Sequence, residues 1–433
     1  MKTIIQQRIA DAINMPLPEL IKRDCQVPAI PNKTFAIIGM RRSGKTYYLY
    51  QTMQAYLDRG IHRERLLYIN FEDERLLDMT INDMHWIVDE YFAIFPENRG
   101  TQTFFFFDEI QRIDQWEIFI RRLMDTENIQ IYVSGSSAKM LSAEIASSMR
   151  GRSVERVIYP YSFREFLRCH DIPRPESIQL VDKGMRSFYE NYSLKYLTTG
   201  GFPEVQFLPD YERQLLLQQY ANTVTFRDIV DRYNVQNLNV LKKLIHFLIV
   251  NAGGYFSVNK FYHLLKSNGI KVSKNTLHEY LEYIQGSYLL KMITIHSQSD
   301  KKRMVNPMKP YIIDTGLAAS FSSSQTLNYG HHLENCIFVE LCRRNARISY
   351  LKTSSGYEID FIADYPDGAR DIIQVSADIS SPSTREREIR ALYEVNTQMS
   401  HGNLILINLS EENNLIKNDV TIHIMPAWKW LLL

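Results

Sequence analysis

Short apolar runs alternate with polar and helix-patterned stretches through the first part of the chain. Each run is short enough for a buried parallel strand, and polar or helical sequence follows it. The runs are FAII at 35–38, RLLYINF at 65–71, TFFFF at 103–107 and IQIYV at 129–133. This rhythm predicts an α/β domain with a parallel sheet over residues 1–170, and such sheets gather ligand-binding groups at the carboxyl ends of their strands.

The octapeptide GMRRSGKT at 39–46 follows the first run, and a helical pattern leaves it. Its glycines let backbone N–H groups curl around phosphate oxygens, while the helix that follows points its positive end at them. Lys45 would reach the β- and γ-phosphates and Thr46 would hold Mg²⁺. A glycine turn with an incidental lysine is the alternative. The predicted nucleotide-binding residues of this loop are Gly39, Arg42, Ser43, Gly44, Lys45, Thr46 and Tyr47, and no catalytic role is assigned to Arg42.

The third apolar run ends in Asp108 and Glu109. Asp108 is placed to hold Mg²⁺ through water, and Glu109 is placed to polarise the water that attacks the γ-phosphate. The pair therefore predicts hydrolysis as well as binding. The alternative is that the two carboxylates cap the following helix.

Two further segments carry candidate residues. The fourth run leads into SGSS at 134–137, where a serine, with Ser136 preferred, would sense the γ-phosphate or its water; a tight loop that caps the next helix is the alternative. A helical pattern then leads to Arg150 and Arg152. Oligomeric ATPases place an arginine here that reaches a neighbouring subunit's γ-phosphate. Arg152 is the preferred candidate, and a solvated surface arginine is the alternative.

Composition adds limits to this picture. The 433 residues are 45% apolar and 23% charged, which suits two to four globular domains, and the net charge of +1 implies no global attraction to nucleic acid or acidic membranes. Four scattered cysteines form no CxxC pair and no zinc spacing, as expected in a reducing compartment. With no secretory leader and no 18-residue apolar run, the chain is expected to be cytoplasmic and to have no membrane partner.

The middle of the chain is mainly helical. Residues 171–235 predict a helical lid, and residues 236–325 read as three short helices and two strand-like runs, a pattern that predicts a winged helix. In the third helix Leu277, Leu281 and Ile284 would face the core. Its outward residues would be Lys274, Asn275, His278 and Glu282.

The predicted wing has a basic tip, Asp300-Lys-Lys-Arg303, which could hold the phosphates of double-stranded DNA. Acidic residues on the third helix, Glu279 and Glu282, weaken the case for insertion into a groove. A protein-packing role is therefore the alternative.

Residues 326–433 predict an α/β domain of the restriction-endonuclease type. Such folds bind Mg²⁺ with a helix glutamate, a strand aspartate and a Glu-x-Lys on the next strand. Glu334 and Asp360 fill the first two positions, but the third reads Gln374-Val-Ser376. A neutral amide is a poor Mg²⁺ ligand, and Asp378 or Lys352 would substitute only with suitable geometry. Nuclease activity is not expected, and the fold is expected to serve as a binding or structural module.

Taken together, these segments resemble the large bacterial and archaeal family of AAA-superfamily ATPases with a C-terminal domain of unknown function and a nuclease-like core. The resemblance covers nearly the whole chain and implies that ATP is the nucleotide, that Gly44, Lys45 and Thr46 bind ATP and Mg²⁺, and that Asp108 and Glu109 serve hydrolysis. The chain departs from the family pattern at 374 and 376, where Glu-x-Lys is usual. The segments that carry the resemblance are GMRRSGKT, FFFFDE, SGSSAKML, MRGR, YPYSFREFL, GGFPE, YIIDTGLA and GYEIDFI.

The leading hypothesis is an ATPase whose nucleotide state alters the placement of the winged-helix and C-terminal domains, within a homo-oligomer, with double-stranded DNA as the favoured partner. One alternative is a nucleotide-gated scaffold that binds a protein and hydrolyses ATP negligibly. Another is an ATP-regulated, metal-dependent nuclease.

Overall fold

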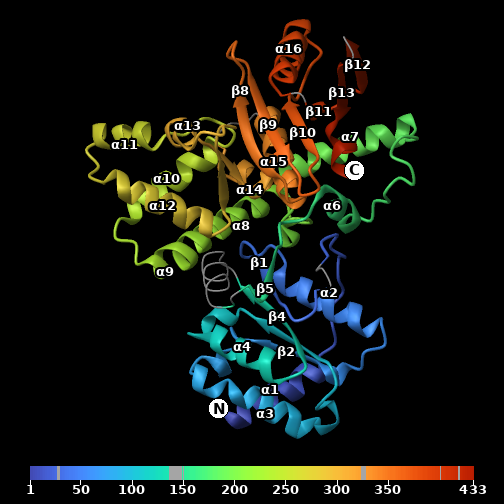
Figure 1. The fold of residues 1–433 in the computed structure, drawn as a ribbon, viewed down its shortest axis with the longest axis vertical. Helices are drawn as coiled ribbons and strands as arrows, with labels where there is room; N and C mark the ends of the chain where they lie inside the picture. The colour runs from blue at the N-terminus through green and yellow to red at the C-terminus, as the bar shows by residue number, and fades with distance from the viewer. Residues whose placement is uncertain (27–29, 136–148, 150, 323–327, 400, 418–419) are drawn as a thin grey trace. The chain divides into compact units, whose positions relative to one another are not determined.

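A computed structural model of the chain describes residues 1–433 apart from 27–29, 136–148, 150, 323–327, 400 and 418–419 (Figure 1). It divides the chain into two compact units. Unit 1 comprises Met1–Tyr159 and Gly286–Tyr288, and unit 2 comprises Pro160–Gln285 and Leu289–Leu433.

Unit 1 is built on a five-stranded parallel sheet with the order β2-β3-β4-β1-β5. The loops after β1, β3 and β4 therefore leave from one edge of the sheet, where strand order brings them close together. The four predicted strands are confirmed, and the structure adds a fifth at the edge. The strands are β1 (Thr34–Ile38), β2 (Leu66–Asn70), β3 (Thr103–Asp108), β4 (Ile129–Gly135) and β5 (Ser153–Val157).

Helices cover both faces of this sheet, because side chains alternate along each buried strand. Helix α2 (Lys45–Leu57) packs Tyr48, Leu49 and Met53 on one face. The other face is covered by α1 (Lys2–Asn14), α3 (His85–Ile94) and α4 (Trp116–Thr126). The result is a three-layer α/β fold, as the apolar rhythm predicts.

The first half of unit 2 is helical. A π-helical turn, Val224–Val230, follows α8, and the next four helices are followed by an antiparallel pair of strands, β6 and β7. The basic segment predicted as a wing tip forms the short helix α13 between these strands. Leu277, Leu281 and Ile284 are buried in α12, as predicted. The elements are α6 (Phe163–Cys169), α7 (Lys183–Thr199), α8 (Asp210–Thr223), α9 (Asp231–Tyr233), α10 (Leu238–Val250), α11 (Val258–Ser267), α12 (Lys274–Gly286), β6 (Leu290–Ile293), α13 (Asp300–Val305), β7 (Lys309–Ile312) and α14 (Thr315–Ser320).

The second half of unit 2 contains a six-stranded mixed sheet with the order β12-β13-β11-β10-β9-β8. Helix α16 packs Leu392 and Val395 on one face, while Phe338 of α15 meets Phe361 on the other. The first helix is followed by three strands, as the sequence predicts, whereas the second helix, α16, was not predicted. The elements are α15 (Tyr329–Arg343), β8 (Arg347–Lys352), β9 (Glu358–Asp364), β10 (Arg370–Val375), α16 (Pro382–Gln398), β11 (Asn403–Asn408), β12 (Asn413–Lys417), β13 (Val420–Pro426) and α17 (Ala427–Leu432).

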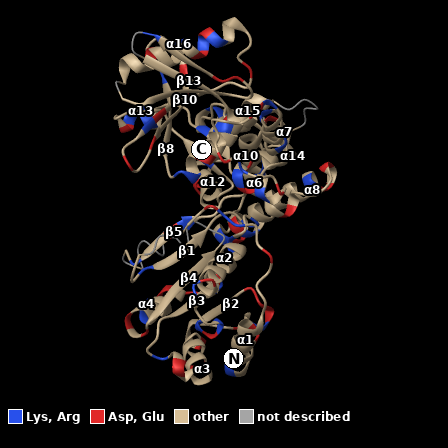
Figure 2. Cartoon of the chain, turned by 90° about the vertical axis from the view of Figure 1, so that its right-hand side faces the viewer, with Lys and Arg blue, Asp and Glu red and all other residues tan. Residues whose placement is uncertain are grey.

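Charged residues of both signs are interspersed over each unit (Figure 2). This matches the near balance of 50 basic and 49 acidic residues. Among the described helices, none combines the length and the apolar character needed to cross a membrane.

Candidate active site

The loop between β1 and α2 requires glycine at two positions. Gly39 has a φ of 143°, and a Cβ atom there would lie 2.4 Å from the carbonyl oxygen of Ile158. Gly44 has a φ of 98° at the start of α2, a left-handed conformation that favours glycine. The backbone therefore curls in front of the helix, as a phosphate-binding loop must.

Lys45 begins α2 and is only 5% exposed. Its Nζ donates to the carbonyl oxygens of Gly39 and Met40, both at 3.2 Å, and lies 4.0 Å from Glu109 Oε1. Neutral carbonyls are weaker partners for an ammonium than phosphate oxygens are. A phosphate group can therefore take their place without leaving a strong ion pair broken.

Asp108 ends β3 and accepts hydrogen bonds from three hydroxyl groups. Thr46 Oγ1 lies 2.7 Å and Tyr68 Oη 2.8 Å from its Oδ2, while Ser134 Oγ donates to Oδ1. Burial, and next the charge of Glu109, raise the pKa of Asp108. Over the described part of the chain, no lysine or arginine forms an ion pair with this carboxylate. It is thus a buried hard-oxygen ligand without a fixed counter-ion.

These residues fit a magnesium ion with a bound nucleotide. A carboxylate and a hydroxyl, Asp108 and Thr46, are the oxygen ligands that Mg²⁺ prefers beside phosphates. Ser43 Oγ is buried in the loop without a hydrogen-bond partner among the described residues, so it is available to a ligand.

Glu109 adopts a left-handed backbone, with a φ of 53°. Such a conformation is costly for a residue other than glycine and persists where the surroundings hold it. Here the backbone N–H of Glu109 donates to Ser134 Oγ at 3.1 Å, and Gln111 Nε2 donates to its Oε2 at 2.5 Å. The structure thereby brings Lys45 close to Glu109, which directly follows Asp108 in the chain.

Two of the remaining predicted residues lie in the loop and in the first turn of α2. Arg42 has a positive φ of 67°, and Tyr47 is 54% exposed. Ser136 and Arg150 lie outside the described residues.

Arg152 lies at the amino-terminal end of the sheet strands, whereas the phosphate-binding loop lies at their carboxyl-terminal end. It directly precedes β5, whose first residue, Ser153, pairs with Thr34 at the start of β1, and it forms an exposed ion pair with Asp125. The loop leaves the other end of β1, and five strand residues span about 16 Å. Arg152 therefore does not reach the loop of its own chain along this strand.

Sequence reasoning missed two residues that support the loop. Arg23 is 7% exposed, and its Nη1 donates to the carbonyl oxygen of Ser43 at 3.0 Å. Tyr68 binds Asp108 from the neighbouring strand β2. No motif marks Arg23, whereas a lone hydroxyl near the end of an apolar strand is a usable signal for Tyr68.

Unit 2 brings Glu334 and Asp360 together, as predicted, but around a residue that the sequence analysis did not single out. Lys309 of β7 places its Nζ 3.2 Å from Glu334 Oε1 and 3.7 Å from Asp360 Oδ1, and it also pairs closely with Glu358. Burial by itself lowers the pKa of Lys309, but these carboxylates raise it above its ordinary value. The four side chains form a charged centre, which we call the Lys309 centre. Lys309 and Asp360 are buried in it, and the side chains of Glu334 and Glu358 are 14% and 29% exposed.

The other residues of the predicted nuclease motif have partners within the chain, and Gln374 Oε1 accepts from the backbone N–H of Asp360 at 3.4 Å. Gln374 Nε2 donates to Glu388 Oε2 at 2.7 Å, and Ser376 Oγ donates to the carbonyl oxygen of Asp378 at 3.1 Å. Lys352 Nζ lies over the ring of Tyr255. In the part of the chain that the structure describes, no three His, Cys, Asp or Glu side chains are grouped to hold a metal ion.

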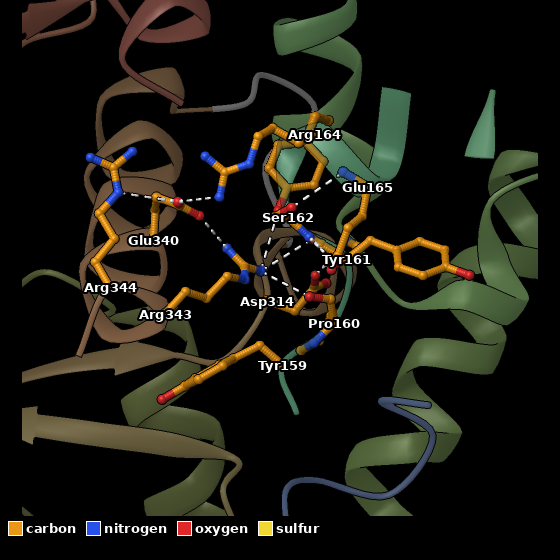
Figure 3. A network of polar contacts seen from close by, with 12 residues as sticks. Tyr159, Pro160, Tyr161, Ser162, Arg164, Glu165, Asp314, Glu340, Arg343 and Arg344 are labelled. Carbon is orange, nitrogen blue, oxygen red and sulfur yellow. Dashed lines mark hydrogen bonds and ion pairs between the residues drawn. The ribbon is translucent and has the colours of Figure 1, made fainter. Parts of the chain in front are cut away.

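A further polar network in unit 2 shows what several of the segments that carry the family resemblance do in the fold (Figure 3). Arg343 Nη2 donates to the carbonyl oxygens of Pro160, at 2.9 Å, and Tyr161, at 3.1 Å, and its Nη1 lies 3.1 Å from Glu340 Oε2. These contacts attach the YPYSF segment to α15.

Asp314 fastens two glycine-containing segments in the same network. Its Oδ2 accepts from the backbone N–H of Gly201 at 2.6 Å, and its Oδ1 accepts from that of Leu317 at 2.9 Å. A Cβ atom on Gly316 would lie 2.1 Å from the carbonyl oxygen of Thr199. Burial raises the pKa of Asp314 to about 6. The GGFPE and DTGLA segments are therefore packing elements of unit 2.

Comparisons with known proteins agree with this geometry. A family model described as an AAA domain matches residues 31–167, and two models described as domains of unknown function, DUF8612 and DUF4143, match 191–328 and 329–430. The sheet order, the loop and the Asp108 site define a P-loop ATPase of the AAA superfamily. An uncharacterised protein of Methanocaldococcus jannaschii is 33% identical over 96% of this chain and 91% of its own length. The chain belongs to the family of this protein, which confirms the resemblance.

Other relatives are more distant. An uncharacterised protein of Haemophilus influenzae is 32% identical over 76% of this chain and 78% of its own length. Among solved structures, a Walker-type ATPase of Pyrococcus abyssi covers 74% of this chain and 95% of its own, with 13% identity and a TM-score of 0.39. That score supports no functional inference.

Proposed function

We propose that this protein binds ATP with Mg²⁺ at the loop of unit 1 and hydrolyses it. The observation that carries the proposal is that Thr46 donates to a buried Asp108 with no counter-ion among the described residues, while Lys45 lies beside the adjacent Glu109. Lys45 would bind the β- and γ-phosphates, and Thr46 and Asp108 would hold the ion, which offsets charge on the transferring phosphoryl group. Glu109 would accept a proton from the attacking water.

Glu109→Gln tests this function, because the amide keeps the shape of the side chain and cannot accept the proton. We expect ATP binding to be retained and turnover to fall by about 100-fold or more. Glu97→Gln, an exposed glutamate of the same unit, is the matched control. Steady-state hydrolysis and fluorescent-nucleotide binding are measured for all three proteins. Unchanged turnover in Glu109→Gln would remove Glu109 from its role.

The proposal extends to double-stranded DNA as the partner that nucleotide state controls. In it, residues 171–235 act as a lid and 236–325 as a winged helix. The supporting observation is α13, where exposed Lys301 and Lys302 stand beside Met304, which is 86% exposed. Basic residues bind phosphates, and an exposed apolar side chain can contact a groove.

Hydrolysis with and without DNA at two salt concentrations tests this partner. We expect DNA to stimulate turnover more strongly at low salt, because phosphate contacts release counter-ions. The double variant Lys301→Ala/Lys302→Ala should lose the stimulation, whereas Lys243→Ala/Lys260→Ala, which removes two exposed lysines elsewhere in unit 2, should keep it. If DNA does not change the rate of hydrolysis, a protein partner is favoured. If no hydrolysis is detected, the nucleotide-gated scaffold is favoured.

Arg152 would act on a neighbouring copy of the chain in this proposal. The supporting observation is its position at the edge of the sheet opposite its own loop. Mixing Arg152→Ala with Glu109→Gln tests it, because a mixed oligomer would contain sites with both residues intact. Turnover above that of either variant alone is expected, and no gain on mixing would contradict a role in trans.

A further inference from the structure

The nuclease-like half of unit 2 implies a divalent cation, but its residues do not fit one. The position that normally supplies a third carboxylate holds Gln374, whose amide donates to Glu388. The carboxylates of Glu334 and Asp360 contact an ammonium group of the same chain instead. The fold therefore implies a metal ion at a position where the carboxylates already contact Lys309.

Lys309 is placed to supply the positive charge that a divalent cation supplies in a metal-dependent nuclease site. Only 3% of the residue is exposed, and it reaches Glu334 of α15 and both Glu358 and Asp360 of β9 from the strand β7. Buried carboxylates are very costly without a positive partner, and removal of one partner from such a group leaves the others uncompensated. An ammonium offers three donors and a full charge, which serves three carboxylates at once.

The outer contacts of the Lys309 centre are also satisfied by the chain itself. Tyr311 Oη donates to Glu334 Oε1 at 2.5 Å, and the backbone N–H of Val375 donates to Asp360 Oδ2 at 2.9 Å. Tyr255 Oη donates to Glu358 Oε2. Hydrogen bonds to the remaining lone pairs are what a buried ion pair needs to be stable. The centre is therefore complete without a metal ion.

We propose that the ammonium of Lys309 occupies the place of the divalent cation in this nuclease-like centre. It closes the centre to metal and fastens the β6–β7 strand pair to the sheet that carries Asp360. A competing assignment makes Lys309 a catalytic lysine beside a bound metal. The two assignments differ in whether the unaltered centre binds a divalent cation.

Binding of Mn²⁺ without nucleotide separates them. The measurement uses the full chain with Asp108→Asn, which removes the metal ligand of unit 1, and compares it with the same protein carrying Lys309→Ala or, as a matched control, Lys352→Ala. Free Mn²⁺ is counted by electron paramagnetic resonance. We expect one bound equivalent with Lys309→Ala, and none in the Asp108→Asn parent or the Lys352→Ala control.

Either of two results overturns the proposal. Mn²⁺ bound by the parent and lost with Glu334→Gln would make Lys309 a neighbour of a metal ion, and no binding in Lys309→Ala would show that the carboxylates do not form a cation site. If Lys309→Ala does not fold, the charge-balanced Lys309→Met/Glu358→Gln pair retains Glu334 and Asp360 and is measured in its place. No ATP is present, so the outcome is independent of the proposed hydrolysis.

Discussion

Two buried aspartates, one in each unit, differ in the groups that surround their carboxylates. Asp108 is 1% exposed and Asp360 is 7% exposed. Asp108 accepts hydrogen bonds from hydroxyl groups, which carry no charge, whereas Asp360 lies within 3.7 Å of the ammonium of Lys309. Both carboxylates are buried, and under the two proposals above the Asp108 centre takes its cation from outside, whereas the Asp360 centre already contains one.

The two buried lysines extend the comparison, and replacing each gives the largest expected effect. Lys309→Met should lower the free energy of unfolding by about 3–5 kcal/mol, because it leaves the buried carboxylate of Asp360 and the partly exposed carboxylates of Glu334 and Glu358 without their partner. Lys45→Met should lower it by about 1.5 kcal/mol or less, because the principal partners of Lys45 are two neutral carbonyls. Nucleotide binding should be lost only in Lys45→Met. Denaturant titration and nucleotide binding on both variants check this, and equal losses of stability would break the comparison.

Asp314 is a third buried aspartate, and within the described part of the chain its carboxylate contacts neither a cluster of hydroxyl groups nor a lysine. We expect its titration to change the free energy of unfolding by an intermediate amount. Burial raises its pKa to about 6 in the folded chain, from an ordinary value of 3.8. Its stabilising contribution is therefore fully present below about pH 4 and is lost as the pH rises through about 6. That contribution amounts to about 3 kcal/mol.

Asp314→Asn checks this pH dependence, because the amide does not titrate. The wild-type free energy of unfolding, relative to that of the variant, should decrease between pH 4 and pH 7. Denaturant titrations at several pH values on both proteins measure the difference. A difference that does not change with pH would show that the backbone N–H donors, and not burial, dominate at Asp314.

Tyr68→Phe should have a smaller effect confined to unit 1. It removes one hydrogen bond to Asp108, which is worth about 1.5 kcal/mol for a charged acceptor. We expect the apparent affinity for Mg²⁺ during hydrolysis to fall by about tenfold. Tyr56→Phe is the matched control, because the Tyr56 hydroxyl contacts Tyr132 and not the site. An equal response of both variants to Mg²⁺ would remove Tyr68 from the support of Asp108.

Arg152→Ala should have the smallest effect on stability. The Arg152 and Asp125 side chains are 45% and 58% exposed, and exposed pairs contribute about 1 kcal/mol or less. Thermal denaturation of this variant, beside Lys309→Met, would show that burial gives the Lys309 centre its strength. A loss comparable with that of Lys309→Met would contradict this account.

Most of unit 1 could be predicted because its signals are local. The apolar runs of β1 and β3 lie next to the loop and Asp108, so strand and site residues occur together in the sequence. Strand β5 was not predicted, because SVERV carries Glu155 and Arg156 and is only partly buried at the sheet edge. An edge strand needs no continuous apolar run.

By itself the sequence determined the phosphate-binding loop, the Asp108–Glu109 pair and the strands β1 to β4, because periodicity and motif spacing act over short stretches. Only the tertiary structure decided that Tyr68 supports Asp108, 40 residues away, and that Lys309 meets Glu334, 25 residues away, and Asp360. No local sequence pattern predicts these contacts. They depend on which strands and helices pack together, and that packing places the ammonium of Lys309 beside the carboxylates of Glu334 and Asp360.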